Sequence, residues 1–198
     1  MSIPLSISWS EGKLTILDQQ KLPHEIEYIT LETLEDVFDA IFSLKVRGAP
    51  AIGIAAAYGL ALSAVRHETE DLETFFHFVQ KDADYLGSSR PTAVNLVWAL
   101  KRLAAAVQGA ENVERAKAIL VEEAVRIHEE DEASCRQIGA FGLELLEGKK
   151  RVMTLCNAGS IATANTGRHL HRSISGRKSD GNSKCLRARR GRYSKARA

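Results

Sequence analysis

The sequence predicts an α/β protein, in which an N-terminal domain with a short β-sheet and a helical bundle is followed by the start of a parallel α/β domain. Three observations lead to this prediction. The first residues alternate apolar and polar side chains, the long middle part has helical periodicity, and a strand, a glycine turn and a helix start follow in that order. The predicted divisions are residues 1–147 for the first domain, 148–164 for the start of the second, and 165–198 for a basic tail.

The predicted sheet begins with a hairpin. Leu5–Trp9 and Lys13–Leu17 alternate apolar and polar residues, and Glu11-Gly12 between them suits a tight turn. Ile26–Ile29 is a third β-prone segment. Together these segments predict a small sheet at the start of the first domain.

Helical periodicity predicts two helices directly after the sheet. Thr33 suits an N-cap and Asp36 stands three residues later, the spacing of a capping box, ahead of an apolar face that ends near Leu44. A second helix starts at Pro50 and is rich in Ala and Gly. Because small side chains let neighbouring helices approach closely, we expect this helix at the centre of the bundle.

Three further helices complete the predicted bundle. Thr69–Leu86 is amphipathic, and the next helix is expected to begin at Pro91, because proline is tolerated in a first helical turn. Asn112 opens a long helix that ends near Leu145. Gly139 and Gly142, close to that end, predict tight packing of the last helix against a neighbour.

Charge is divided unevenly along the chain. Residues 165–198 hold 11 of the 27 Lys and Arg but one of the 25 acidic residues, which leaves 16 basic and 24 acidic residues in 1–164. The net charge of +2 therefore combines an acidic body with a basic tail. A basic tail is typical of nucleic-acid binding, which gives one hypothesis for the function.

Other features of the composition argue against several classes of protein. The three cysteines form no CxxC pair and no cluster with histidine, so neither a disulfide framework nor a metal site is predicted. The N-terminus lacks the pattern of a signal peptide. The longest uncharged run, Gly48–Val65, is rich in small residues and shorter than the roughly 20 apolar residues of a membrane span. We therefore expect a cytoplasmic protein.

Two loops place an arginine directly before a predicted helix. Arg47 and Gly48 precede the helix that starts at Pro50, and Arg90 precedes Pro91. A helix N-terminus carries partial positive charge and free backbone N–H groups, so an arginine there is favourable when an anion binds as well. The two loops favour a phosphate-binding site, in which Gly48 lets the backbone come close to the ligand. Two solvent-exposed arginines in tight turns are the alternative.

Cys156 is the third candidate. It ends the β-prone run Arg151–Leu155 and faces the predicted helix start, a position that lowers the pKa of a thiol and raises its reactivity. A buried, inert cysteine is the alternative. That alternative is the prediction for Cys135, which stands in the middle of the long helix.

Four stretches resemble the methylthioribose-1-phosphate isomerase family of aldose–ketose isomerases. They are KVRGAPAIGIAAAYGLAL (45–62), SSRPTAVNLVWAL (88–100), CRQIGAFG (135–142) and TLCNAGSIATA (154–164). The resemblance extends over nearly all of the chain before the basic tail. It implies that the second domain is Rossmann-like and that the full-length protein is a homodimer.

The resemblance also implies an activity. It assigns substrate binding to Arg47, Gly48, Ala49 and Arg90, and catalysis to Cys156 paired with an aspartate further along the family's sequence. The implied reaction moves a hydrogen between C1 and C2, and converts 5-methylthioribose 1-phosphate to 5-methylthioribulose 1-phosphate in methionine salvage. The implied partner is a small sugar phosphate, with no metal or other cofactor, no nucleic acid and no membrane.

After Ala164 the sequence departs from the family. The stretch expected to carry the aspartate is not found, but the tail's codons, read one base earlier, can encode a helical pattern and then a β-prone run similar to the family's continuation. We interpret residues 165–198 as out-of-frame sequence after a truncated enzyme, and expect the chain as printed to be inactive. Three hypotheses stand beside this one: a ribose-1,5-bisphosphate isomerase of the same superfamily, a non-catalytic initiation-factor-2B-like regulatory subunit, and a nucleic-acid binder.

Overall fold

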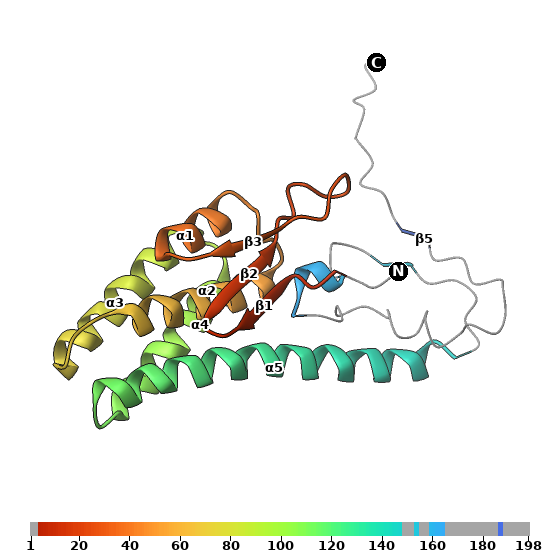
Figure 1. The fold of residues 1–198 in the computed structure, drawn as a ribbon. Coiled ribbons are helices and arrows are strands. Elements are labelled where there is room, and N and C mark those ends of the chain that lie inside the picture. Colours follow the sequence, from red (N-terminus) through yellow and green to blue (C-terminus); the bar gives the residue numbers. More distant parts are fainter. Residues whose placement is uncertain (1–3, 148–152, 155–158, 165–185, 188–198) are drawn as a thin grey trace, which may run out of the picture.

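The computed structural model describes residues 4–147, 153–154, 159–164 and 186–187 (Figure 1). A three-stranded sheet comes first and a helical bundle follows, with the long helix α5 running along one side of the bundle. The α-helices in the described part of the chain are α1 (Leu34–Phe42), α2 (Ala49–Arg66), α3 (Leu72–Ser88), α4 (Val94–Ala106) and α5 (Val113–Leu145). The short elements outside the sheet are the 3₁₀ turns η1 (Val107–Gly109) and η2 (Ser160–Ala162), and the parallel strand pair β4 (Met153–Thr154) and β5 (Leu186–Arg187).

The N-terminal sheet is antiparallel, with strand order β1-β2-β3. Its strands are β1 (Ile7–Ser10), β2 (Lys13–Leu17) and β3 (Tyr28–Leu31). The turn between the first two has positive φ at both central residues, 53° at Glu11 and 73° at Gly12, as a tight two-residue hairpin requires. The predicted hairpin is therefore confirmed.

The third strand lies two residues later than its pattern predicted. Ile26 at the predicted start is 64% exposed, so it makes no contribution to the core. Leu31, at the end of β3, is buried and pairs with the buried Leu14 of β2. Burial of this pair sets the register, because a shift by one residue would turn Leu31 away from the core.

The first helix begins as its sequence predicts. The backbone N–H of Asp36 donates to Thr33 Oγ1 at 3.1 Å, and the backbone N–H of Thr33 donates to Asp36 Oδ2 at 2.9 Å. Both halves of the capping box are thus present. The box satisfies two N–H groups that the helix itself leaves without a partner.

The start of the fourth helix was predicted wrongly. Pro91 does not open α4, which begins three residues later at Val94. Instead, the backbone N–H of Ala93 donates to the carbonyl of Arg90 at 2.9 Å, which places Pro91 at the second position of a turn. Proline is favoured both there and in a first helical turn, so the residue type by itself does not separate the two structures.

Helix α2 lies at the centre of the bundle, as predicted, and contacts α1, α3, α4, α5 and the sheet. A β-carbon added to Gly59 would lie 2.6 Å from Val37 of α1, and one added to Gly53 would lie 2.9 Å from the carbonyl oxygen of Asn95 in α4. Of the described helices, α2 is the one long and apolar enough to cross a membrane by composition, but 78% of it is buried within the fold. It is a core helix in this structure.

The C-terminal part of α5 does not pack as Gly139 predicted. A β-carbon added to Gly139 would have no neighbour within 4 Å. Nearby, Ile138, Phe141 and Leu145 are 45%, 64% and 78% exposed. The predicted close contact is therefore wrong for this glycine. By contrast, Cys135, one turn earlier, is buried as predicted.

The two helical glycines allow a matched test of the packing of α2. Gly59→Ala forces a methyl group against the buried Val37, so we expect the free energy of unfolding to fall by about 1–2 kcal/mol despite the better helix propensity of alanine. Gly139→Ala gains propensity without a clash, so we expect a rise of about 0.5–1 kcal/mol. Urea unfolding of both variants measures the two changes. Equal signs would contradict this account of α2.

Candidate functional site

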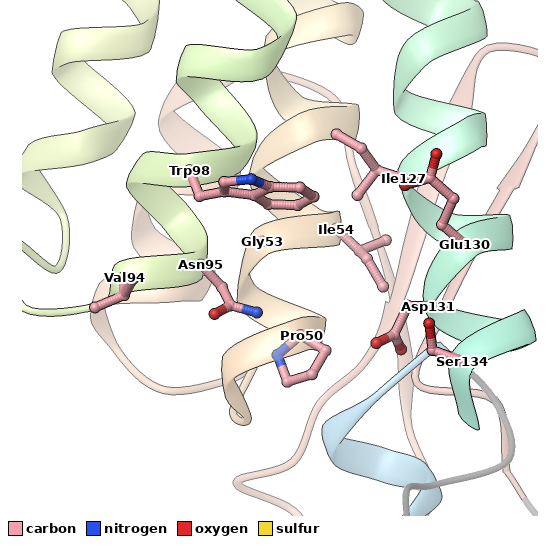
Figure 2. Close-up of a pocket in the computed structure, with 10 residues that line it drawn as sticks. All are labelled: Pro50, Gly53, Ile54, Val94, Asn95, Trp98, Ile127, Glu130, Asp131 and Ser134. Carbon is pink, nitrogen blue, oxygen red and sulfur yellow. The ribbon is translucent and has the colours of Figure 1, made fainter. Parts of the chain in front are cut away.

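The two predicted arginine loops lead into helices that border one cavity. Helices α2 and α4 both begin at one end of a cavity of about 400 Å³, and α5 forms its opposite wall (Figure 2). Pro50 and Asn95 line it at the helix starts, and Asp131 and Ser134 face them from α5. The cavity has the size of a site for a small molecule.

The helices that begin at this cavity lack the side-chain caps of the other three. Thr33, Asp71 and Asn112 each accept a hydrogen bond from a backbone N–H in the first turn of α1, α3 and α5. No side chain caps α2 or α4, and neither helix has an acidic residue in its first turn. Their first N–H groups and the positive ends of their dipoles are thus available to an anion.

Arg47 is held beside the start of α2. Its side chain is exposed, and Nη2 donates to the backbone carbonyl of Gln19 at 2.7 Å. A guanidinium has five N–H donors, so this bond leaves others for a ligand. The Gln19 amide returns a bond of 3.2 Å from Nε2 to the carbonyl of Arg47. These two hydrogen bonds attach both the side chain and the backbone of Arg47 to Gln19.

Residues 159–164 pack directly against this loop. A β-carbon on Gly48, whose φ is +107°, would lie 2.5 Å from the backbone of Ala162. Gln19 Nε2 also donates to the carbonyl of Ile161 at 2.8 Å, and Ser6 Oγ donates to the carbonyl of Thr163 at 2.5 Å. The glycine was predicted to let the backbone approach a ligand. In the structure, the group that approaches Gly48 is the backbone of Ala162.

The same segment reaches the cavity wall. The backbone N–H of Ala164 donates to Asp131 Oδ2 at 2.9 Å, and Figure 2 shows the blue segment that contains η2 running up toward Asp131 and Ser134. Gln19, which is 1% exposed, keeps its Oε1 without a hydrogen-bond partner in the described part of the chain. A buried amide oxygen without a partner costs free energy. Gln19 Oε1 is therefore an acceptor that can take a hydrogen bond where the loop and residues 159–164 meet. The loop, the segment and α5 thus meet at one place.

Arg102 organises the charges on the far side of the cavity. Its guanidinium binds Glu130 at 2.5 and 2.8 Å and the buried Glu123 at 2.6 Å, and it lies 5.3 Å from the ring centre of Trp98. The hydrogen bonds from Arg102 hold the pKa of Glu130 below its usual value. Glu130 is therefore ionised at neutral pH, and the cation that neutralises it is already engaged by Glu123 as well.

A sequence profile described as the initiation factor 2 subunit family matches residues 45–179, more than half of the chain. The chain belongs to the initiation factor 2 subunit family. Within its known relatives, the methylthioribose-1-phosphate isomerase of Geobacillus kaustophilus is 60% identical over 169 residues, and that of Geobacillus thermodenitrificans 59%. These alignments cover 85% of this chain and 48% of each relative. The chain spans about half the length of the curated relatives it matches.

Two solved structures of the family have a similar fold. The 5-methylthioribose 1-phosphate isomerase of Pyrococcus horikoshii has a TM-score of 0.78 and 36% identity, over 83% of this chain and 47% of that one. The delta subunit of translation initiation factor eIF-2B from A. fulgidus has a TM-score of 0.81 and 39% identity, over 93% of this chain and 54% of that one. The shared fold therefore accompanies both an enzyme and a translation-factor subunit.

Four of the five predicted site residues fall in the described part of this family member. Arg47, Gly48 and Ala49 lead into α2, and the half-buried Arg90 lies in the turn before α4. None of these four residues is among those that line the cavity; the residues that line it at the helix starts are Pro50 in α2 and Val94 and Asn95 in α4. Cys156 lies outside the described residues, which resume three positions later at Gly159. No group of three or more His, Cys, Asp or Glu among the described residues is arranged to hold a metal ion.

Several residues at the site were not predicted. Val94 and Trp98 are exposed apolar residues four positions apart in α4, a spacing that could have indicated an apolar strip facing a ligand. No sequence pattern around Asn95 or Asp131 indicated that these residues line a ligand cavity. No pattern indicated Gln19 either, because its amide contacts carbonyls that are 28 and 142 positions away.

Two glycines with positive φ test the contact between the loop and residues 159–164. Gly12→Ala adds only backbone strain, since nothing lies within 4 Å, so we expect the free energy of unfolding to fall by about 1–2 kcal/mol. Gly48→Ala adds backbone strain at a φ of +107° and a collision with Ala162, so we expect a larger fall of about 2–4 kcal/mol. Urea unfolding measures both. Hydrogen exchange at the Ala164 amide should accelerate in Gly48→Ala alone, and equal acceleration in both variants would argue against the docking contact.

Proposed function

We propose that this chain forms the phosphate-binding part of an isomerase that converts 5-methylthioribose 1-phosphate to 5-methylthioribulose 1-phosphate in methionine salvage. The observation that carries the proposal is the pair of uncapped helix starts, each preceded by an arginine, at one end of the cavity. Relatives named methylthioribose-1-phosphate isomerase, up to 60% identical, support the choice of reaction.

The phosphate at C1 binds at the start of α2. The backbone N–H groups that follow Gly48 and the guanidinium of Arg47 supply hydrogen bonds and positive charge there, and Arg90 adds a second cation from the turn before α4. Polar groups of Asn95 and Asp131 lie next along the cavity, where they can hydrogen bond to sugar hydroxyls. Each of these groups holds the substrate by geometry that exists before binding, which lowers the entropic cost of orientation.

Cys156 and a carboxylate from further along the family's sequence form the acid–base pair in this proposal. One group delivers a proton to the ring oxygen as the bond between C1 and that oxygen breaks, the other removes a proton from the substrate, and the hydrogen moves from C2 to C1; such a pair contributes typically 10²–10⁴-fold to a rate. The docked residues 159–164 begin three positions after Cys156 and are held by Ser6, Gln19 and Asp131. This attachment holds residues 159–164 beside the loop that contains Arg47.

The wider organisation of the protein is part of the same proposal. Residues 1–147 form the N-terminal domain, 148–164 begin a Rossmann-like domain, and 165–198 form a tail without a separate role. The protein acts in the cytoplasm on a small sugar phosphate, as a homodimer when full length, without a nucleic-acid or membrane partner.

A regulatory role of the initiation-factor-2B kind is the second candidate function. The similarity to the delta subunit of that factor, with a TM-score of 0.81, favours it. A regulatory subunit needs the fold but not a catalytic thiol or a substrate. Binding of the sugar phosphate therefore separates the two functions.

Substitution of Arg47 tests the binding half of the proposal. We expect the 198-residue chain to bind 5-methylthioribose 1-phosphate in isothermal titration, and Arg47→Ala to raise the Kd at least tenfold, because a hydrogen bond to a charged group contributes about 1.5–3 kcal/mol. Arg115→Ala is the matched control, since this arginine pairs with Glu122 on the surface of α5. Absence of binding, or equal effects of both substitutions, would refute the proposed function.

A chimeric protein tests the catalytic half. The 169 aligned residues of the Geobacillus kaustophilus isomerase are replaced by those of this chain, so that the rest of the relative supplies the carboxylate. We expect isomerase activity, followed by ³¹P NMR, and a loss of about 10²-fold or more in the Cys156→Ser chimera. A chimera that is folded by circular dichroism but inactive would count against the proposal, as would full activity of the Cys156→Ser form.

A further inference from the structure

We propose that Gln19 is a positioning residue that couples ligand binding at Arg47 to the docking of residues 159–164. The inference rests on the proposed function, because it takes the phosphate-binding loop before α2 as one of the two places that are coupled. Gln19 is not among the residues that line the cavity, and it makes no contact with substrate in this proposal. Its role is to let the filled loop and the docked segment stabilise each other.

Gln19 is attached to the loop before α2 through both its side chain and its backbone. Its Nε2 donates to the carbonyl of Arg47 at 3.2 Å, and its own carbonyl accepts from Arg47 Nη2 at 2.7 Å. Its backbone N–H donates to the carbonyl of Lys45 at 2.9 Å. Because three hydrogen bonds join Gln19 to this loop, a ligand that orders Arg47 also orders Gln19.

The same amide group also reaches the docked segment. Gln19 Nε2 donates to the carbonyl of Ile161 at 2.8 Å. An amide nitrogen carries two hydrogens, so the carbonyls of Arg47 and Ile161 use both of them. Rotation of the amide by half a turn would place Oε1 against two carbonyl oxygens, so these two bonds determine its orientation. Gln19 is 1% exposed, which keeps bulk water from competing for either bond.

The loop and the segment also touch each other directly. The closest atoms to a β-carbon on Gly48 belong to Ala162, at 2.5 Å, and Ala162 is itself buried. The loop backbone therefore forms part of the surface on which the segment packs. A phosphate that binds the N–H groups after Gly48 orders this surface, and ordering one side of a contact lowers the entropic cost of forming it. Linkage requires the converse, that docking favours binding by the same factor.

Ser6 gives independent access to the docked segment. Its Oγ donates to the carbonyl of Thr163 at 2.5 Å, and its own carbonyl accepts from the backbone N–H of Leu17 at 2.9 Å. Neither bond involves the loop before α2. Ser6→Ala therefore weakens docking while it leaves the hydrogen bonds between Gln19 and Arg47 in place.

Hydrogen exchange in the full 198-residue chain, followed by NMR at the Ala162 and Ala164 amides, tests the coupling. We expect saturating 5-methylthioribose 1-phosphate to slow exchange at both amides by about fivefold or more in the wild-type chain, as a coupling of ordinary size would. Gln19→Met keeps the length of the side chain but has no donor, so we expect the ligand to slow exchange by less than about twofold. Gln19→Asn is a second variant with the same expectation, because its shorter side chain cannot span both carbonyls.

Two controls separate positioning from a purely structural role. Ser6→Ala should speed exchange at Ala164 without ligand but retain the full slowing by ligand, because Gln19 is intact. Gln20→Ala should change neither quantity, since the amide of this neighbouring glutamine donates to the carbonyl of Ser43 and touches neither coupled segment. Circular dichroism checks that each variant keeps the fold.

The outcomes distinguish this inference from the proposed function. If isothermal titration shows that the wild-type chain does not bind 5-methylthioribose 1-phosphate, the proposed function itself fails. If the ligand binds but leaves exchange at Ala162 and Ala164 unchanged, the coupling is absent although the binding site stands. Full slowing by ligand in both Gln19→Met and Gln19→Asn would overturn the role of Gln19, as would its loss in Ser6→Ala.

Discussion

Helix α2 contacts the other four α-helices and the sheet, and it can do so because its side chains are small where its neighbours come close. At Gly59 the side chain of Val37 occupies the space that a β-carbon would need, and at Gly53 the backbone of Asn95 does so. The second contact brings the first turns of α2 and α4 together. The cavity, its two uncapped helix starts and the wall formed by α5 all follow from this close approach.

The starts of α2 and α4 lack the stabilisation of a side-chain cap, and this leaves backbone N–H groups there as hydrogen-bond donors. A side-chain cap stabilises a helix by about 1 kcal/mol, and α2 and α4 both lack one, whereas α1, α3 and α5 are capped. Gly48 adds a backbone conformation with φ of +107° that other residues rarely adopt. Hydrogen bonds of the buried Gln19 to two carbonyls hold the loop in place of a cap. Departures from local rules of this kind are typical of functional sites.

The fold by itself does not choose between the two kinds of relative. An isomerase and a translation-factor subunit have TM-scores of 0.78 and 0.81 against this chain, so the shared architecture serves both. The distinction depends on single side chains that meet a ligand. Arg47 at the start of α2 is the residue to which the proposed function gives that role, and in this structure it donates to the carbonyl of Gln19.

Local patterns determined much of this protein: the hairpin, the capping box of Thr33 and Asp36, the central place of α2 and the candidate arginines were all predicted from short stretches of sequence. Each depends on residues that interact within a few positions or on one periodic face. Pro91 was predicted wrongly because a turn and a helix start favour the same residue. Only the tertiary structure decided that Gly48 meets Ala162, that Gln19 joins two loops and that Trp98 faces Ile127 across a cavity. Those contacts join residues far apart in the chain, and no local preference encodes them.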